Sequence, residues 1–277
     1  MRKILSALVL CALLAGCAAA AEDGELTAVF YDVGKADAIL LYTENAAVLI
    51  DAGKNKAGQQ ILDDLAARGI EKLDFLIVTH FDKDHVGGAD AIVKGIPVAR
   101  ALEPAYRGDS KQLTQYREAL QEAGIEAEAL SENLSFELDG LRFDVDVANA
   151  DFYGEDEEND FSLVVRLSHG GVRFLFAGDA EGTRLAELID EGDLASDVLK
   201  VPHHGNHEKL SALFFESVSP EYAIITSDEK EPEDERVVTA LQIAGAEVLL
   251  TRNGTIELIS DGISVKRPAP DGPGQVF

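Results

Sequence analysis

Basic residues are scarce in this sequence relative to acidic ones. The 277 residues include 24 lysines and arginines against 51 aspartates and glutamates, which gives a formal net charge of −27 at pH 7. A surface this acidic repels polyanions at long range, whereas proteins that bind nucleic acid present a basic patch. The composition therefore argues against a general nucleic-acid-binding protein. It does not exclude a phosphate substrate at a metal site, because bound metal ions reverse the sign of the local field.

Cysteine is almost absent, and its two copies, Cys11 and Cys17, lie near the N-terminus. A short basic start is followed by an apolar run at 4–14, which is too short for a mature membrane-spanning helix of about 20 residues. The run ends in Leu-Ala-Gly-Cys, which resembles a bacterial lipoprotein signal cut before Cys17, with Cys17 lipidated. The alternative is an ordinary secretory signal cut after one of the alanines at 18–21. We expect export in either case, without a disulfide, so the core alone must hold the fold.

Short apolar runs and helical patterns predict an α/β protein. We expect strands at 27–33, 38–42, 47–51, 73–79, 161–167, 172–177, 198–201, 246–250, 255–259 and 263–265. We expect helices at 57–68, 110–123 and 232–244, each followed by a glycine that suits the left-handed turn after a helix. With no repeat or linker, this order predicts one α/β domain of packed sheets with outer helices.

The predicted organisation has four parts. These are a signal peptide at 1–16, a lipidated tether at 17–25, the folded domain at 26–266 and a loose tail at 267–277, which is rich in proline and glycine.

The stretch Thr-His-Phe-Asp-Lys-Asp-His-Val-Gly-Gly, residues 79–88, concentrates side chains that can bind metal. It follows a predicted buried strand. His80 and Asp82 are two residues apart and point to the same side of an extended backbone. Asp84 and His85 lie one residue into the following turn, so two pairs of ligands can face two neighbouring ions. Taken alone, the stretch could equally be a polar loop with Asp84 capping the next helix.

Two more predicted strands end in residues of the same kind. The apolar strand at 175–179 ends at Asp179, and the segment at 201–206 carries His203 and His204. Functional sites of α/β proteins form at the carboxyl ends of strands. Taken singly, Asp179 could cap a helix and the two histidines could lie in a surface turn, but the three motifs together favour a metal site.

In this order, the three motifs resemble the metallo-β-lactamase fold, in the variant found in the hydrolase domain of the ComEC-type competence protein. Three further segments look like motifs of that variant: 30–38 like its D-V-G-Q-G-D-A signature, 49–53 like its I-D-x-G strand end, and 159–165 like its N-x-x-S-L segment. The resemblance covers residues 26–266 and implies an αββα sandwich, with two central mixed sheets and outer helices. It does not fix the substrate, because one fold carries many functions.

The resemblance also implies a site for two divalent metal ions. His80 and Asp82 would bind the first ion, Asp84, His85 and His203 would bind the second, and Asp179 would bridge both. The candidate catalytic residues are Asp84 and His204, and His204 would donate a proton or contact the substrate. An equally good reading gives His204 a supporting or packing role.

Five other residues are expected around the ions. Asp51 would orient a ligand histidine, as ligand imidazoles usually require. Asn159 and Ser162 stand where many family members carry a third histidine for the first ion, and Asp32 and Asp37 should approach the cleft. The missing histidine makes the first site richer in oxygen. The ligand set suits zinc best, with manganese or iron as alternatives.

We therefore predict an exported metal-dependent hydrolase that is anchored to the outer face of a membrane and cleaves a phosphodiester or a related ester of a small molecule. One alternative is a nuclease that assists DNA uptake or scavenging, which the acidic run at 154–160 disfavours. Another is a non-enzymatic lipoprotein that uses the fold to bind a partner, which the complete ligand set disfavours. A β-lactamase fits less well, because the motifs match the other branch of the family.

The lipidation of Cys17 can be tested by cell fractionation. Wild-type protein should sediment with membranes, because the two or three acyl chains of a bacterial lipoprotein hold stably where a single chain is marginal. Cys17→Ser should move the protein to the soluble exported fraction without changing its activity on a soluble substrate. A soluble distribution of both forms would favour the ordinary secretory signal.

Overall fold

The computed structural model describes residues 24–150, 153 and 158–268. The predicted signal peptide, Cys17 and the tail from residue 269 lie outside the described residues, as does the acidic segment 154–157. Among the described helices, none has the length and apolar character needed to cross a membrane.

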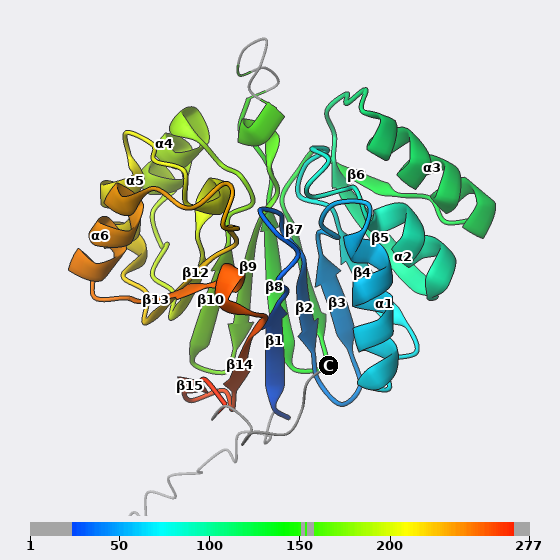
Figure 1. Cartoon of the computed structure of the whole chain (residues 1–277), viewed down its shortest axis with the longest axis horizontal. Helices are drawn as coiled ribbons and strands as arrows, with labels where there is room; N and C mark the ends of the chain where they lie inside the picture. The colour runs from blue at the N-terminus through cyan, green and yellow to red at the C-terminus, as the bar shows by residue number, and fades with distance from the viewer. Residues whose placement is uncertain (1–23, 151–152, 154–157, 269–277) are drawn as a thin grey trace, which may run out of the picture.

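Within this part of the chain, two mixed β-sheets pack face to face (Figure 1). The first sheet contains β1 (Leu26–Phe30), β2 (Ile39–Tyr42), β3 (Ala47–Ile50), β4 (Leu73–Ile77), β5 (Val98–Pro104), β6 (Glu128–Leu130), β14 (Ile256–Ser260) and β15 (Val265–Lys266). Its strand order is β15-β14-β1-β2-β3-β4-β5-β6. The second sheet contains β7 (Leu134–Leu138), β8 (Leu141–Asp146), β9 (Val164–His169), β10 (Val172–Phe176), β11 (Val198–Lys200), β12 (Tyr222–Ile225) and β13 (Glu247–Leu250). Its strand order is β13-β12-β11-β10-β9-β8-β7.

Helices cover the outer face of each sheet. The first sheet is covered by α1 (Ala57–Ala67), α2 (Ala89–Gly95) and α3 (Lys111–Ala123), and the second by α4 (Gly182–Glu191), α5 (Ser211–Val218) and α6 (Glu235–Ile243), as Figure 1 shows. Short 3-10 turns lie at η1 (Glu158–Phe161), η2 (Pro202–Gly205) and η3 (Thr251–Asn253). The arrangement confirms the predicted αββα sandwich.

Three apolar layers hold the sandwich together. The central layer lies between the sheets, where the Phe30 ring from the first sheet stacks on Phe176 from the second at 6.2 Å between centroids. The other two layers lie between each sheet and its helices. Strands buried on both faces read as continuous apolar runs rather than alternating ones, which is why β3 and β10 were recognisable in the sequence.

The helix ends follow the local sequence. Ser110 caps α3 by accepting a hydrogen bond from the Leu113 backbone N–H, and Gly124 ends the helix at φ +70°. The helix predicted from residue 232 begins only at Glu235, because the Asp234 side chain accepts from the Arg236 N–H and acts as the N-cap.

Parallel pairing brings the polar loops to one edge of the sandwich. Strands β3 and β4 are parallel in the first sheet, and β10 and β11 are parallel in the second. The carboxyl ends of each parallel pair therefore lie together. Asp51 follows β3, the 79–88 stretch follows β4, Asp179 follows β10, and the two adjacent histidines follow β11.

Two glycines allow the loop after β4 to press against its neighbours. A Cβ atom on Gly87 would lie 2.2 Å from the Lys83 carbonyl oxygen, and one on Gly88 would lie 2.2 Å from the Ala52 carbonyl oxygen. No side chain fits at either distance. The glycines thus set how closely the metal-capable loop approaches the end of β3.

We expect Gly88→Ala to lower the free energy of unfolding by about 1–3 kcal/mol, because the added methyl group meets backbone that cannot move aside easily. Gly171→Ala is the matched control, since a Cβ there would have its nearest contact at an ordinary 3.5 Å. The control should change stability by no more than about 0.5 kcal/mol in urea unfolding. Equal stability of the two variants would contradict the close-approach argument.

Candidate metal centre

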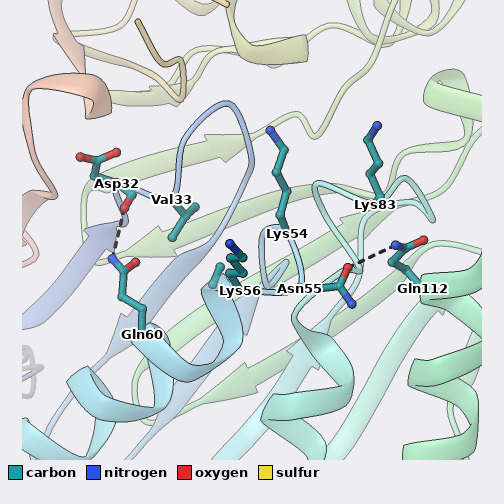
Figure 2. A pocket seen from close by; sticks show the side chains of 9 residues that line it. Asp32, Val33, Lys54, Asn55, Lys56, Gln60, Lys83 and Gln112 are labelled. Carbon is teal, nitrogen blue, oxygen red and sulfur yellow. Dashed lines mark hydrogen bonds between the residues drawn. The ribbon is translucent and has the colours of Figure 1, made fainter. Parts of the chain in front are cut away.

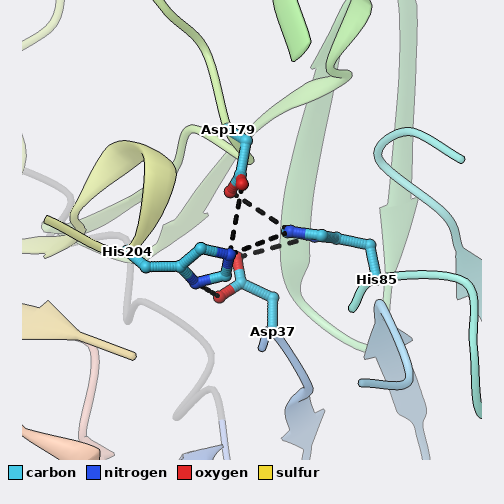
Figure 3. A group of neighbouring side chains, drawn as sticks. All are labelled: Asp37, His85, Asp179 and His204. Atoms are coloured by element: carbon cyan, nitrogen blue, oxygen red, sulfur yellow. Dashed lines mark hydrogen bonds and ion pairs between the residues drawn. The ribbon is translucent and has the colours of Figure 1, made fainter. Parts of the chain in front are cut away.

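Four buried side chains converge between the two sheets: Asp37, His85, Asp179 and His204 (Figure 3). Each offers one atom, and these atoms all lie within 4.8 Å of one another. Asp37 and His85 come from loops of the first sheet, whereas Asp179 and His204 come from loops of the second. The centre therefore joins the two halves of the sandwich.

His85 points its Nε2 atom into this cluster. On the other side of the ring, Nδ1 lies 2.8 Å from Asp51 Oδ2. The Asp51 carboxylate also accepts hydrogen bonds from the Thr79 backbone N–H at 2.8 Å and the Thr79 hydroxyl at 2.7 Å, so it is rigidly held. Nε2 lies 3.2 Å from Asp179 Oδ1 and 3.3 Å from His204 Nε2. A carboxylate behind the ring is the usual device for presenting the opposite nitrogen to a metal.

His204 is held in the same way from the second sheet. Its Nδ1 atom lies 2.9 Å from the Thr226 hydroxyl oxygen, and that hydroxyl donates to Asp37 Oδ1 at 2.6 Å. Its Nε2 atom faces the cluster, 3.1 Å from Asp179 Oδ2 and 3.7 Å from Asp84 Oδ2. The ring thus presents Nε2 to the same point as His85.

A fully buried lysine, Lys200, completes the cluster, and the sequence analysis did not identify it. Its Nζ atom lies 2.5 Å from Asp37 Oδ2 and 3.8 Å from Asp179 Oδ1, and it donates to the Gly178 carbonyl at 3.2 Å. The signal in the sequence was a lysine inside the apolar run 198–201. With one oxygen held by Lys200 and the other by Thr226, Asp37 supports the cluster rather than lying free to bind a metal.

His80 lies beside this cluster with one nitrogen unused. Its ring centroid is 4.0 Å from that of His85, and its Nδ1 atom is 3.1 Å from the Thr79 hydroxyl oxygen and 3.4 Å from the Ser162 hydroxyl oxygen. Its buried Nε2 atom has no hydrogen-bond partner within the described residues. A buried polar atom without a partner needs an explanation, and a metal ion supplies one. Burial, reinforced by the charge of His85, lowers the pKa of His80 well below its usual range, which suits a neutral ligand.

The acidic groups of the cluster are kept charged by their neighbours. Burial alone raises the pKa of Asp179, but His204 and His85 outweigh burial and hold that pKa well below its usual range. Burial lowers the pKa of His85, but Asp179 and Asp51 outweigh it and raise that pKa well above normal. In the same way, the carboxylates of Asp179 and Asp37 overcome burial and raise the pKa of His204. The raised pKa values of both imidazoles mean that the surrounding carboxylates favour positive charge at this point, and a divalent cation can supply that charge.

The two adjacent histidines point in different directions. Both have left-handed backbones, with φ +47° at His203 and +52° at His204. Only the second enters the cluster. The ring of His203 is about one-fifth exposed, with Nδ1 2.5 Å from Glu181 Oε1 and Nε2 2.9 Å from Asn206 Nδ2. The structure thus places His203, predicted as a ligand, outside the group formed by His85, Asp179 and His204.

The remaining predicted residues lie at different distances from the cluster and have different partners. Ser162 supports the centre, because its hydroxyl accepts a hydrogen bond from the Asp179 backbone N–H at 3.1 Å. Asp82 and Asp84 are half-buried on the loop that carries His85. Asn159 lies with His203, since its amide donates to Glu181 Oε1 at 2.8 Å. Asp32 lines a separate surface pocket.

Comparison with known proteins agrees with this geometry. Residues 31–226 match the Metallo-beta-lactamase superfamily. The chain is 28% identical over 259 residues to ComE operon protein 3 of Bacillus subtilis, covering 85% of this chain and 33% of that protein. It is 30% identical over 213 residues to competence protein ComA of Neisseria gonorrhoeae, covering 75% of this chain and 28% of that protein. The chain thus spans a third or less of these relatives.

Solved structures share the fold at lower identity. The metallo-beta-lactamase fold protein YhfI from Bacillus subtilis superposes with a TM-score of 0.58 at 10% identity, covering 84% of this chain and 99% of that one. CmlA beta-hydroxylase superposes with a TM-score of 0.54 at 15% identity, covering 84% of this chain and 53% of that one. With the family match extending over most of the described residues, the chain belongs to the metallo-beta-lactamase superfamily.

Proposed function

We propose that this chain is a phosphodiesterase that binds two divalent metal ions and acts outside the cell, anchored through Cys17. The superfamily assignment and the buried Asp/His cluster indicate a metal-dependent hydrolase. The observation that carries the proposal is the contact of two imidazole nitrogens with one buried aspartate, beside a third imidazole whose Nε2 has no partner among the described residues. His85 and His204 contact Asp179, and His80 lies beside them with an unused Nε2. An aspartate so placed can bridge two cations and reduce their mutual repulsion.

From this geometry we propose a ligand set slightly different from the one expected from the sequence. His80, Asp82 and Asp179 would hold the first ion, and Asp84, His85, His204 and Asp179 would hold the second. His204 therefore takes the ligand role that the sequence gave to His203. When bound, such ions act as Lewis acids, lower the pKa of water toward about 7 and neutralise charge on a phosphoryl oxygen. We favour zinc for the nitrogen-rich second site, although the oxygen-rich first site also suits manganese or iron.

The surrounding residues hold the ligands in place. Asp51 fixes the orientation of His85, and Thr226 and Asp37 fix that of His204. Lys200 places its Nζ atom behind Asp37 and Asp179, at 2.5 Å and 3.8 Å from their carboxylate oxygens.

His203 takes the place proposed for His204 as the proton donor to the leaving group. Its ring is partly exposed, and Glu181 holds it from behind at Nδ1. A general acid must reach the departing oxygen. The partly exposed His203 ring can do so by exchanging its Asn206 contact at Nε2 for the substrate, whereas the His204 ring is buried and directs Nε2 at Asp179.

Metal content separates the roles of the two histidines. The wild-type chain should hold about two divalent ions, the number that a bridged site binds. Asp179→Ala should lose both ions and nearly all hydrolysis, and His204→Ala should lose at least one. His203→Ala should keep its metal but lower kcat by about 100-fold, as loss of a general acid does.

His207→Ala is the control for these variants, because His207 is exposed. Metal would be measured by mass spectrometry, and hydrolysis with bis(p-nitrophenyl) phosphate. An active, metal-loaded Asp179→Ala would rule out the proposed centre. Loss of metal from His203→Ala with retention in His204→Ala would restore the ligand assignment made from the sequence.

A nuclease is the second candidate, since the chain is similar to competence proteins. The net charge of −27 predicts weak cleavage of long DNA beside that of a small phosphodiester. Moderate salt should raise DNA cleavage at first, because it screens the repulsion. Basic DNA-binding proteins show the reverse, a steady loss of affinity with salt. Efficient digestion at low salt that falls steadily as salt is added would favour the nuclease.

A further inference from the structure

A lysine-lined pocket lies beside the loops that carry the metal centre. Its volume is about 530 Å³, and its walls come from the β1–β2 loop, the segment that leads into α1, the loop after β4 and the start of α3. Its polar lining includes Lys54, Asn55, Lys56, Gln60, Lys83 and Gln112. Three ammonium groups in one pocket are unexpected in a chain with twice as many acidic as basic residues.

These three lysines make no ion pair within the described residues. The lysines that do so there are Lys72, Lys94 and Lys200. The protein carries many carboxylates, yet these three lysines form no salt bridge with the described ones. Their positive charges are therefore available to bind an anionic ligand. Asp32 is the one acidic residue of the pocket lining, so the lining keeps a positive balance.

The pocket has a fixed floor and free cationic groups. Gln112 donates to Asn55 Oδ1 at 3.2 Å, and Gln60 donates to the Asp32 carbonyl at 3.1 Å. Figure 2 shows that Lys54 and Lys83 extend in the same direction from two different loops. Two ammonium groups that line one pocket above a hydrogen-bonded base suit a compact anion with several oxygen atoms, such as phosphate.

The pocket and the metal centre share their loops. Lys83 stands between Asp82 and Asp84 in the sequence, and Lys54 follows Gly53. The Gly53 backbone N–H donates to the Asp37 carbonyl at 2.7 Å, and the Gly53 carbonyl accepts from the Gly88 N–H at 3.0 Å. An anion bound by Lys54 and Lys83 would therefore lie next to the loop that carries the proposed metal ligands.

We propose that Lys54, Lys56 and Lys83 form a subsite for a second phosphate group of the substrate, adjacent to the phosphodiester that is cleaved. The inference rests on the proposed phosphodiesterase function and narrows its substrate class to nucleotide-like molecules with at least two phosphate groups. Fixed local cations can recognise one phosphate even though the whole surface is acidic, because long-range repulsion is screened beyond about 8–10 Å in physiological salt.

Two chromogenic substrates test the subsite: thymidine 5′-(p-nitrophenyl phosphate) and the same compound with a 3′-phosphate. The wild-type chain should prefer the 3′-phosphorylated compound by about tenfold in kcat/KM, the effect of roughly one charge-assisted contact. Lys54→Gln/Lys83→Gln should reduce that preference to less than about twofold. The control, Lys72→Gln/Lys266→Gln, removes the same charge at exposed positions that do not line the pocket, and should keep the full preference.

Binding measurements separate failure of the subsite from failure of the enzyme assignment. Thymidine 3′,5′-bisphosphate and thymidine 5′-monophosphate would be titrated into the metal-loaded chain by calorimetry. Tighter binding of the bisphosphate that is lost in Lys54→Gln/Lys83→Gln would support the subsite, even if neither ester is cleaved. Equal binding of the two nucleotides to wild-type protein would overturn it, even if both esters are cleaved. If the double variant loses metal, Lys54→Gln/Lys56→Gln repeats the test without changing the metal loop.

Discussion

The compensation of buried negative charge is the constraint on which this structure depends. Asp37, Asp51 and Asp179 are almost completely excluded from solvent at the meeting point of the two sheets. Unpaired, each would cost several kcal/mol or more to bury. Lys200, His85 and His204 supply the opposing charge, and each lies within hydrogen-bonding distance of at least one of these carboxylates. The strands, the parallel pairing and the tight glycine turns serve to bring these groups together.

Much of the fold could be predicted from sequence because its strong signals are local. The buried strands are short apolar runs, and the site loops begin where those runs end. Which of His203 and His204 points into the cluster could not be predicted in the same way. The two histidines are adjacent in the sequence, so either could point into the cluster. Which one does so depends on the left-handed backbone of both residues and on Thr226, which follows the neighbouring strand β12. Only the folded backbone contains that information.

Lys200 illustrates a second limit of the sequence. A lysine within an apolar strand can be seen in the sequence, but its partners cannot. Asp37 is far from Lys200 along the chain, and the contact with Gly178 is to a backbone carbonyl, which every residue has. Composition has the same weakness. A net charge of −27 describes the sum of the charges and not their arrangement. It does not indicate that three lysines without ion pairs in the described part of the chain line one pocket beside the centre. Electrostatic arguments from sequence are therefore safer for long-range behaviour than for what a single pocket recognises.

The division of the centre between the two sheets couples metal supply to the lifetime of the protein. His85 belongs to one half of the sandwich and Asp179 and His204 to the other, so an ion held among them would link the two halves. A ligand that binds only the folded state adds about 2.7 kcal/mol of stability at a concentration of 100 times its Kd. In a cell short of the metal, the protein would lose more than its catalytic activity. Without the ion, the chain would unfold more often, and proteases would degrade it faster. A shortage of the metal would then lower the amount of the protein in the cell.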